Sequence, residues 1–157
     1  MDTNTTIATR PVVILMVEDN PTDVLIAKEG LLSAKMLSTV HVADDGMYAM
    51  DFLHRKGKYA NAPRPDLILL DLNMPRMDGR EVLSEITKDE HLRHLPVVIL
   101  TSSQDDQEIL EMYQLRCSSY IVKPLDFQEL IRFMQSFADY WLTVVVLPSP
   151  TKAVVRT

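Results

Sequence analysis

The sequence predicts an α/β fold, a doubly wound sheet of five parallel strands in the order 2-1-3-4-5 with five flanking helices. The first observation is a set of short apolar runs without polar alternation: VVILMV at 12–17, LILL at 67–70 and VVIL at 97–100. Such runs are typical of strands buried on both faces, as in a parallel sheet covered by helices. The second observation is that helical patterns separate the runs. Right-handed crossovers between parallel strands then favour the doubly wound, flavodoxin-like order.

Two weaker strand patterns complete the sheet, TVHVA at 39–43 and YIV at 120–122. The strand–helix unit therefore repeats about five times, with no sign of a second domain or of a solenoid period. We expect a flexible N-terminal segment over 1–10, one folded domain over 11–140 and an apolar tail over 141–157.

Signals for helix starts lie between the strands. Asn20 can cap a helix that has Pro21 at its first position. The other starts are two capping-box patterns and two segments that fill the gaps: Ser103 with Asp106, Asp126 with Glu129, 46–55 and 79–88.

Composition excludes several classes of function. A net charge of −6 argues against nucleic-acid binding, because no basic field collects phosphates. No apolar stretch is long enough to span a membrane, the N-terminus does not resemble a signal peptide, and the single cysteine, Cys117, cannot form an internal disulfide. We therefore expect a cytoplasmic protein in which Cys117 is a small hydrophobic residue.

Charged and polar side chains follow four of the five predicted strands. Glu18 and Asp19 follow the first, Asp71 the third, Thr101 the fourth and Lys123 the fifth. The first and third strands are neighbours in the predicted order, and open α/β sheets bind ligands in the crevice at the carboxyl ends of such strands. We therefore expect three carboxylates, a hydroxyl and an ammonium to face one pocket.

Three clustered carboxylates repel one another, so this pocket favours a cation. Oxygen ligands suit Mg²⁺, which shares its coordination shell readily with a phosphate. A phosphoryl group on Asp71 would be held by metal, ammonium and hydroxyl together, and aspartyl phosphates are a known covalent mode. Each residue alone has an ordinary explanation as a turn residue or helix cap. Only their joint order along the chain indicates a site.

The motifs VEDN, DLNMPRMDG, LTSS and YIVKP resemble the receiver domain of two-component response regulators, over roughly residues 11–140. The resemblance implies that Asp71 is the phosphoacceptor and that Lys123 contacts the phosphoryl group. It implies that Glu18 and Asp19 are the acidic pair that organises Mg²⁺ with the backbone carbonyl of Asn73. It also implies that Thr101 is the switch hydroxyl and Tyr120 the switch aromatic. The Lys–Pro bond, here Lys123–Pro124, is usually cis in this family.

Two further segments resemble the small response regulators paired with cyanobacterial phytochromes, which are light-sensing histidine kinases. They are the basic loop HRKGKYANAPRPD at 54–66 and the tail DYWLTVVVLPSP at 139–150. The resemblance implies a stand-alone switch that a histidine kinase phosphorylates and that acts by binding partners. It implies no enzyme beyond Mg²⁺-dependent self-phosphorylation and autodephosphorylation, and we expect no output domain.

Two other functions compete with this interpretation. A phosphatase of the haloacid-dehalogenase type also forms an aspartyl phosphate, but it needs its nucleophile after the first strand and a second Asp two residues on, where this chain has Asn73. A flavodoxin relative would bind FMN, yet the acidic strand ends would repel the FMN phosphate. His91 and His94 have a spacing that could serve zinc, without an evident third ligand.

The C-terminal tail is more apolar than a surface terminus tolerates. It either folds back on its own domain or pairs with a second subunit. We expect a homodimer through the fourth helix, the fifth strand, the fifth helix and the tail, modulated by phosphorylation because Tyr120 lies on that face. The basic loop 54–66 is either a solvated surface or a docking patch for an acidic partner.

Overall fold

The computed structural model describes residues 10–34 and 37–148. Within them, five parallel strands form one sheet in the order β2-β1-β3-β4-β5, which confirms the predicted topology. The strands are β1 Val12–Val17, β2 Ser38–Ala43, β3 Leu67–Leu70, β4 Val97–Thr101 and β5 Ser119–Val122. The predicted bounds differ by one residue at β2, β4 and β5, and Thr101 is thus the last residue of β4 rather than the first after it.

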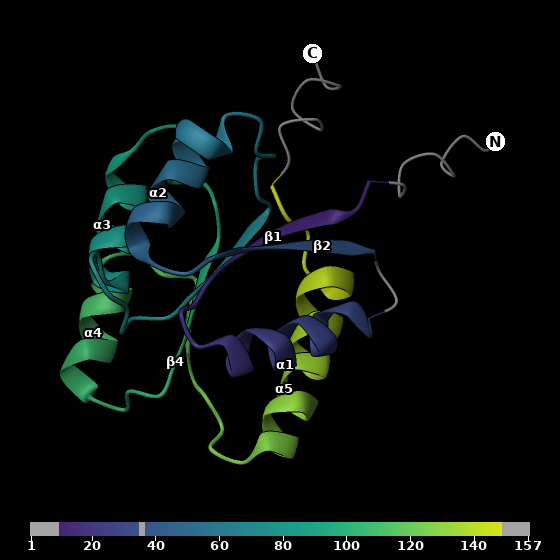
Figure 1. Cartoon of the computed structure of the whole chain (residues 1–157). Helices are drawn as coiled ribbons and strands as arrows, with labels where there is room; N and C mark the ends of the chain where they lie inside the picture. Colours follow the sequence, from purple (N-terminus) through teal and green to yellow (C-terminus); the bar gives the residue numbers. More distant parts are fainter. Residues whose placement is uncertain (1–9, 35–36, 149–157) are drawn as a thin grey trace.

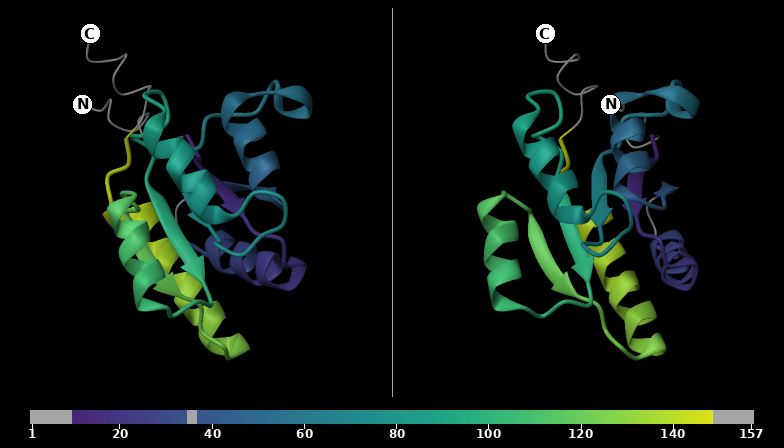
Figure 2. Two further views of the ribbon diagram at one scale, coloured as in Figure 1. Left: turned by 90° about the vertical axis from the view of Figure 1, so that its left-hand side faces the viewer. Right: turned by 60° about the vertical axis from the view of Figure 1, so that its left-hand side comes forward.

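Five α-helices of the described chain cover the two faces of this sheet. They are α1 Pro21–Leu32, α2 Gly46–His54, α3 Gly79–Lys88, α4 Asp106–Gln114 and α5 Phe127–Asp139, with a 3-10 turn η2 at Gly57–Tyr59 and a π-helical turn η3 at Tyr140–Val144. Figure 1 shows α1 and α5 side by side on one face, while α2, α3 and α4 lie on the other. The views in Figure 2 show the same two layers from the side of α3 and α4.

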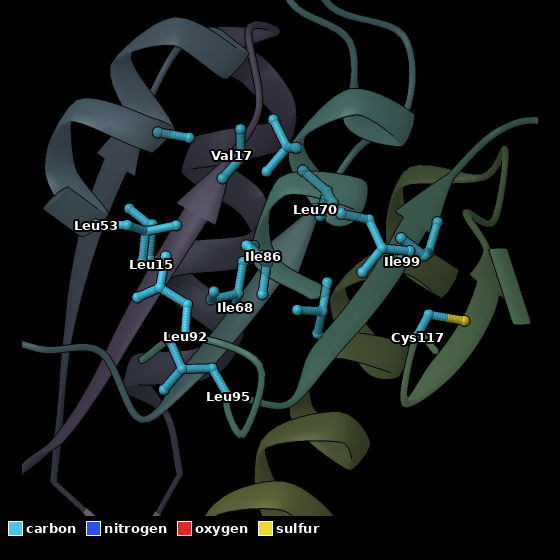
Figure 3. Packing of buried hydrophobic residues seen from close by; sticks show 14 of the residues in the cluster. Leu15, Val17, Leu53, Ile68, Leu70, Ile86, Leu92, Leu95, Ile99 and Cys117 are labelled. Carbon is cyan, nitrogen blue, oxygen red and sulfur yellow. The ribbon is translucent and has the colours of Figure 1, made fainter. Parts of the chain in front are cut away.

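The strands are apolar throughout because both of their faces are buried. In β1, Leu15 and Val17 contribute to the cluster under α2, α3 and α4, whereas Ile14 and Met16 belong to the cluster under α1 and α5. Successive side chains of a strand point to opposite faces, so a strand covered on both sides needs no polar alternation. Figure 3 shows the first cluster, with Cys117 at its edge.

The predicted helix starts are confirmed for α1, α2 and α3, confirmed in part for α5, and wrong for α4. Asn20 Oδ1 accepts hydrogen bonds from the backbone N–H groups of Thr22 and Asp23, and so caps α1. Asp126 caps α5 through Gln128 N–H, two residues on, rather than through the predicted capping box with Glu129.

The start predicted for α4 at Ser103 is wrong. The N-cap is Asp105, whose carboxylate accepts from Gln107 N–H. Ser103 lies in the preceding loop instead, where its hydroxyl accepts a long hydrogen bond from Asp105 N–H. Ser and Asp are equally good capping residues, so the sequence pattern alone could not choose between them.

The chain continues past α5 into its own core. Leu142 in η3 is only 4% exposed, and Trp141 packs beside it against the cluster under α1 and α5. Of the two alternatives for the tail, this part of it folds back on its own domain. Residues 149–157, the rest of the tail, lie outside the described residues, as do residues 1–9.

At the other end, Arg10 belongs to the folded structure, since its guanidinium donates two hydrogen bonds to the Asp66 carboxylate, at 2.8 and 3.1 Å. No helix in the described ranges is long and apolar enough to cross a bilayer. The cytoplasmic location itself stays a prediction.

Candidate functional site

The site lies where the carboxyl ends of β1 and β3 meet. These strands are parallel neighbours with Val17 opposite Leu70, and the N–H of Asp71 donates to the carbonyl of Val17 at 3.0 Å. The pairing brings Asp71 next to the two acids that follow β1. Oxygen atoms of Glu18, Asp19 and Asp71 all lie within 4.8 Å of one another. The predicted convergence of three carboxylates is thus present.

Burial makes this acidic cluster suited to a cation. Glu18 is 3% exposed and Asp71 is 8% exposed, whereas Asp19 is open to solvent. Two carboxylates out of water and within 5 Å of each other are costly unless a positive charge joins them. Hard divalent cations prefer carboxylate oxygens as ligands and often keep bound waters, which the solvent-accessible side of the cluster can admit. The three carboxylates therefore fit such an ion.

Lys123, which follows β5, places its own ammonium group beside this cluster. Its Nζ lies 2.6 Å from Glu18 Oε1, 2.9 Å from Asp23 Oδ2 and 3.6 Å from Asp71 Oδ2. Burial by itself would lower the pKa of the Lys123 ammonium, but its hydrogen bonds to Glu18 and Asp23 and the charge of Asp71 raise that pKa above its ordinary value. Lys123 is therefore a fixed positive charge at the site.

Asp23 was missed by the sequence reasoning. It lies in the first turn of α1, and acidic residues at that place are usually explained by the helix dipole. The available signal was its position, because the start of α1 follows Glu18 and Asp19 directly and so lies at the same edge of the sheet.

The two buried carboxylates differ in their surroundings. Asp71 Oδ1 accepts a hydrogen bond of 2.8 Å from the backbone N–H of Leu72, which leaves Oδ2 facing Lys123. Burial raises the pKa of Glu18, the hydrogen bond from Lys123 lowers it, and the charge of Asp71 raises it again, so that together these effects bring it to about 7. A cation at the cluster would act in the same direction as Lys123 and favour the ionised form.

Thr101 places a hydroxyl at the end of β4 with nothing to bond. The residue is completely buried, and Oγ1 has no hydrogen-bond partner within the described chain. Its backbone carbonyl accepts from Lys123 N–H at 2.7 Å, so Thr101 and Lys123 are held side by side. A buried hydroxyl without a partner is costly, which indicates that it is kept for a group that arrives during function.

Tyr120 is tied to the loop that follows Thr101. Its hydroxyl donates to the carbonyl of Ser103 at 2.9 Å, and its ring is partly buried against the cluster under α2, α3 and α4. Burial raises the pKa of the Tyr120 hydroxyl, so the group remains a hydrogen-bond donor at neutral pH. In this structure Tyr120 is therefore held by its hydroxyl and by the packing of its ring.

The loop after β3 packs tightly beside the phosphoacceptor candidate. A Cβ on Gly79 would lie 2.3 Å from the carbonyl oxygen of Asp71, so only glycine allows this close approach. Asn73 lies exposed in the same loop, two residues beyond Asp71. The Lys123–Pro124 bond, whose isomer the sequence does not decide, is trans in this structure.

The remaining candidates lie elsewhere. Glu18, Asp19 and Asp71 form the one group of three potential metal ligands among the described residues, and His91 and His94 are not part of it. Cys117 is buried, and burial raises the pKa of its thiol to about 11, as expected for a small hydrophobic residue.

Comparison with known proteins agrees with this geometry. The response regulator receiver domain family matches residues 14–135. The chain is 40% identical over 139 residues to the response regulator Rcp1 of Synechocystis sp., covering 88% of this chain and 95% of that protein. The Mn²⁺-bound crystal structure of Rcp1 superposes with a TM-score of 0.86 at 40% identity, covering 88% of this chain and all of the other. The phosphorylated cyanobacterial phytochrome response regulator RcpA gives 0.86 at 41% identity, with 89% and 100% covered.

Proposed function

Because this chain belongs to the response regulator receiver family, we propose that it is a signalling switch that accepts a phosphoryl group on Asp71. One observation carries the assignment to this residue. Of the two buried carboxylates of the cluster, that of Glu18 already accepts a hydrogen bond from Lys123 at 2.6 Å, whereas Asp71 Oδ2 faces the same ammonium at 3.6 Å without one and is available as the nucleophile. Thr101, whose hydroxyl has no partner among the described residues, is joined to Lys123 by a backbone hydrogen bond of 2.7 Å.

The transfer step follows from these positions. An oxygen of Asp71 forms a bond to the phosphorus of the donor while the bond from phosphorus to the donor's leaving atom breaks, and the electron pair stays with that atom. Lys123 offsets part of the charge that develops on the phosphoryl oxygens. Thr101 then donates a hydrogen bond from its free hydroxyl to one of these oxygens, which draws the end of β4 inward.

We propose Mg²⁺ as the metal, held by carboxylate oxygens of Glu18, Asp19 and Asp71 and by the backbone carbonyl of Asn73. When bound, it would neutralise the phosphoryl charge in the transition state. The supporting observations are the 4.8 Å cluster of oxygens and its open side at Asp19, and the relative Rcp1 has been crystallised with Mn²⁺.

We propose a histidine kinase as the donor, and a cyanobacterial phytochrome as the kinase. The support is the likeness to Rcp1 and to the phytochrome response regulator RcpA over nearly the whole length of both. Phosphotransfer should be faster from a phytochrome kinase than from an unrelated histidine kinase at equal concentration. Equal rates from both would contradict the partner assignment while leaving the acceptor residue intact.

The acceptor residue is tested with acetyl phosphate and Mg²⁺, followed by intact-mass analysis. The wild-type protein should gain one phosphoryl group, and Asp71→Asn should gain none. Asp44→Asn, an exposed acid outside the pocket, is the matched control and should behave as wild type. A phosphoryl mass on Asp71→Asn at the wild-type rate would show that another residue is the acceptor.

We also propose that the switch acts as a homodimer through α4, β5, α5 and the segment after α5. β5 is an edge strand of the sheet, and large apolar side chains lie exposed around it. They are Leu110, Tyr113, Val122, Tyr140, Val144 and Val146. A second copy related by a two-fold axis can cover such a self-complementary surface. Tyr120 belongs to the same strand, which offers a link between phosphorylation and assembly.

A further inference from the structure

The ammonium of Lys123 is shared unequally among three carboxylates. It lies at hydrogen-bond distance from Glu18 Oε1 and Asp23 Oδ2, at 2.6 and 2.9 Å, and just outside that distance from Asp71 Oδ2, at 3.6 Å. An ammonium has three N–H donors. Glu18 and Asp23 each accept one of them, so the third is left on the side of Asp71.

The two acceptors differ in what else they can bind. Glu18 belongs to the cluster of potential metal ligands, together with Asp19 and Asp71. Asp23 does not belong to that cluster, and the ion pair with Lys123 is its described side-chain interaction. A metal that takes up the Glu18 carboxylate leaves the contact of Asp23 with the ammonium in place.

The backbone of Asp23 is fixed by the capped first turn of α1. Pro21 begins α1, and Asn20 caps it by accepting from Asp23 N–H at 3.1 Å. The Asp23 side chain is 25% exposed and therefore lies at the rim of the pocket, while that of Lys123 is 11% exposed and lies inside. The start of α1 thus holds the Asp23 carboxylate in place beside the ammonium at the flexible end of the Lys123 side chain.

We propose that Asp23 is a positioning residue for phosphoryl transfer, which anchors the Lys123 ammonium so that its third N–H faces Asp71. The inference rests on the proposed role of Asp71 and Lys123. Without Asp23, the ammonium has two ways to settle. It either moves onto Asp71 and pairs with the nucleophile itself, or it leaves the pocket for solvent. Both slow the transfer, since the nucleophilic oxygen is masked or the phosphoryl charge is no longer offset.

The rate of phosphorylation by acetyl phosphate and Mg²⁺ tests this role. Asp23→Ala should be about five- to tenfold slower than wild type, a loss of the size expected for one misplaced positioning contact. Asp23→Asn keeps an acceptor oxygen without the charge and should recover part of the rate. Glu29→Ala, which removes an exposed acid from the same helix, should leave the rate unchanged.

A double-mutant cycle shows whether Asp23 acts through Lys123. If it does, adding Asp23→Ala to Lys123→Ala should cause no further loss of rate. Two losses that simply multiply would mean that Asp23 acts independently and would overturn the inference. A wild-type rate in both Asp23→Ala and Asp23→Asn would overturn it as well.

Nitrogen-15 NMR of the lysine ammonium groups provides a readout that does not depend on transfer. In the metal-free wild-type protein the Lys123 ammonium should show slowly exchanging protons, because it is buried and hydrogen-bonded on two sides. Asp23→Ala should speed this exchange and shift the signal, while Glu29→Ala should not. An unchanged Lys123 signal in Asp23→Ala contradicts the inference.

The same set of variants separates this inference from the proposed function. If Lys123→Ala is phosphorylated at the wild-type rate, the role of Lys123 in the proposed function is wrong. If Lys123→Ala is slow but Asp23→Ala is not, the proposed function stands and the role of Asp23 is wrong.

Discussion

Arg76 donates a hydrogen bond from Nε to Asp45 Oδ2 at 2.6 Å, and this contact joins the loop after β3 to the N-cap of α2. The Arg76 guanidinium also lies over the ring of Tyr48, 4.7 Å from its centroid. Next to this pair, Gly46 N–H donates to the carbonyl of Met77 at 3.1 Å. The loop that follows Asp71 is therefore braced against α2 by side-chain and backbone contacts together.

Asp45→Ala should lower the free energy of unfolding by about 1–2 kcal/mol at neutral pH, because it removes both a helix cap and the partner of Arg76. The Asp45 carboxylate accepts from Tyr48 N–H at 2.8 Å in addition to its contact with Arg76. Asp44→Ala, the exposed neighbour, is the control and should stay within about 0.5 kcal/mol of wild type. Urea unfolding measures both.

The contribution of Asp45 should also depend on pH. Burial alone would raise the pKa of its carboxyl, but the hydrogen bonds from Arg76 and Tyr48 outweigh burial and hold that pKa below its usual range. The stabilisation is therefore complete above the unfolded-state pKa of about 3.9 and is lost as the pH falls through the lower folded-state value. The stability difference between wild type and Asp45→Ala should shrink toward about pH 2. A difference that stays constant over this range would contradict the assignment.

Thr101→Val should leave the unphosphorylated protein as stable as wild type or up to about 1 kcal/mol more stable, because it removes a buried hydroxyl that has no partner. The variant should still be phosphorylated, but the NMR shifts around α4, β5 and Tyr120 should no longer respond fully. A full response in Thr101→Val would rule out the coupling.

Thr87→Val is a control with the opposite sign. The Thr87 hydroxyl lies 2.9 Å from the carbonyl of Leu83 in its own helix and 2.7 Å from that of Leu115 at the end of α4, so the substitution removes the hydrogen bond that joins α3 to α4. It should destabilise the fold by about 1–2 kcal/mol and leave the phosphorylation response intact.

Gly30→Ala should destabilise the contact between α1 and α5. A Cβ at this position would lie 2.4 Å from Met134 Cβ on α5, so the helices must separate. In an isolated helix alanine is more favourable than glycine by about 1 kcal/mol. We nevertheless expect the substitution to lower the free energy of unfolding by roughly 1–2 kcal/mol, because the clash outweighs this gain. Thermal unfolding measures the effect, with Glu29→Ala as the exposed control on the same helix. An increase in stability would show that α1 and α5 do not pack this closely.

Asp19→Ala should weaken Mg²⁺ binding by about tenfold or more, since it removes the solvent-accessible carboxylate of the cluster. Glu29→Ala removes an equal charge away from the site and should leave the affinity unchanged. A metal titration followed by NMR or tryptophan fluorescence measures both. Unchanged affinity in Asp19→Ala would mean that the metal lies elsewhere.

Leu110→Asp should convert the proposed dimer to a monomer, because it replaces an exposed apolar side chain of α4 with a charge. Leu32→Asp is the matched control, since Leu32 on α1 is 60% exposed and Leu110 is 58% exposed. Val146→Asp tests separately whether the segment after η3 takes part. Light scattering with and without phosphorylation decides the matter, and a wild-type monomer in both states contradicts the dimer. Truncation after Asp139 is unsuitable because it removes the buried Leu142.

Much of this protein was determined by its sequence alone. The apolar runs at β1, β3 and β4 are local signals, because a strand buried on both faces needs apolar residues at every position. The convergence of Asp71, Lys123 and Thr101 could also be predicted from the sequence. Each of them lies at the end of a strand, and parallel strands end at one edge of the sheet. Topology converts their positions in the sequence into neighbours in space.

The tertiary structure alone decided the contacts that depend on side-chain reach and on packing between elements distant in the chain. Asp23 meets Lys123 across 100 residues, and Arg76 meets Asp45 across 31. The N-cap of α4 fell on Asp105 rather than Ser103, although both residue types cap well. Leu142 became part of the core because the turn after α5 packs against the cluster under α1 and α5. Such choices involve small free-energy differences among many partners, and only the assembled fold selects one of them.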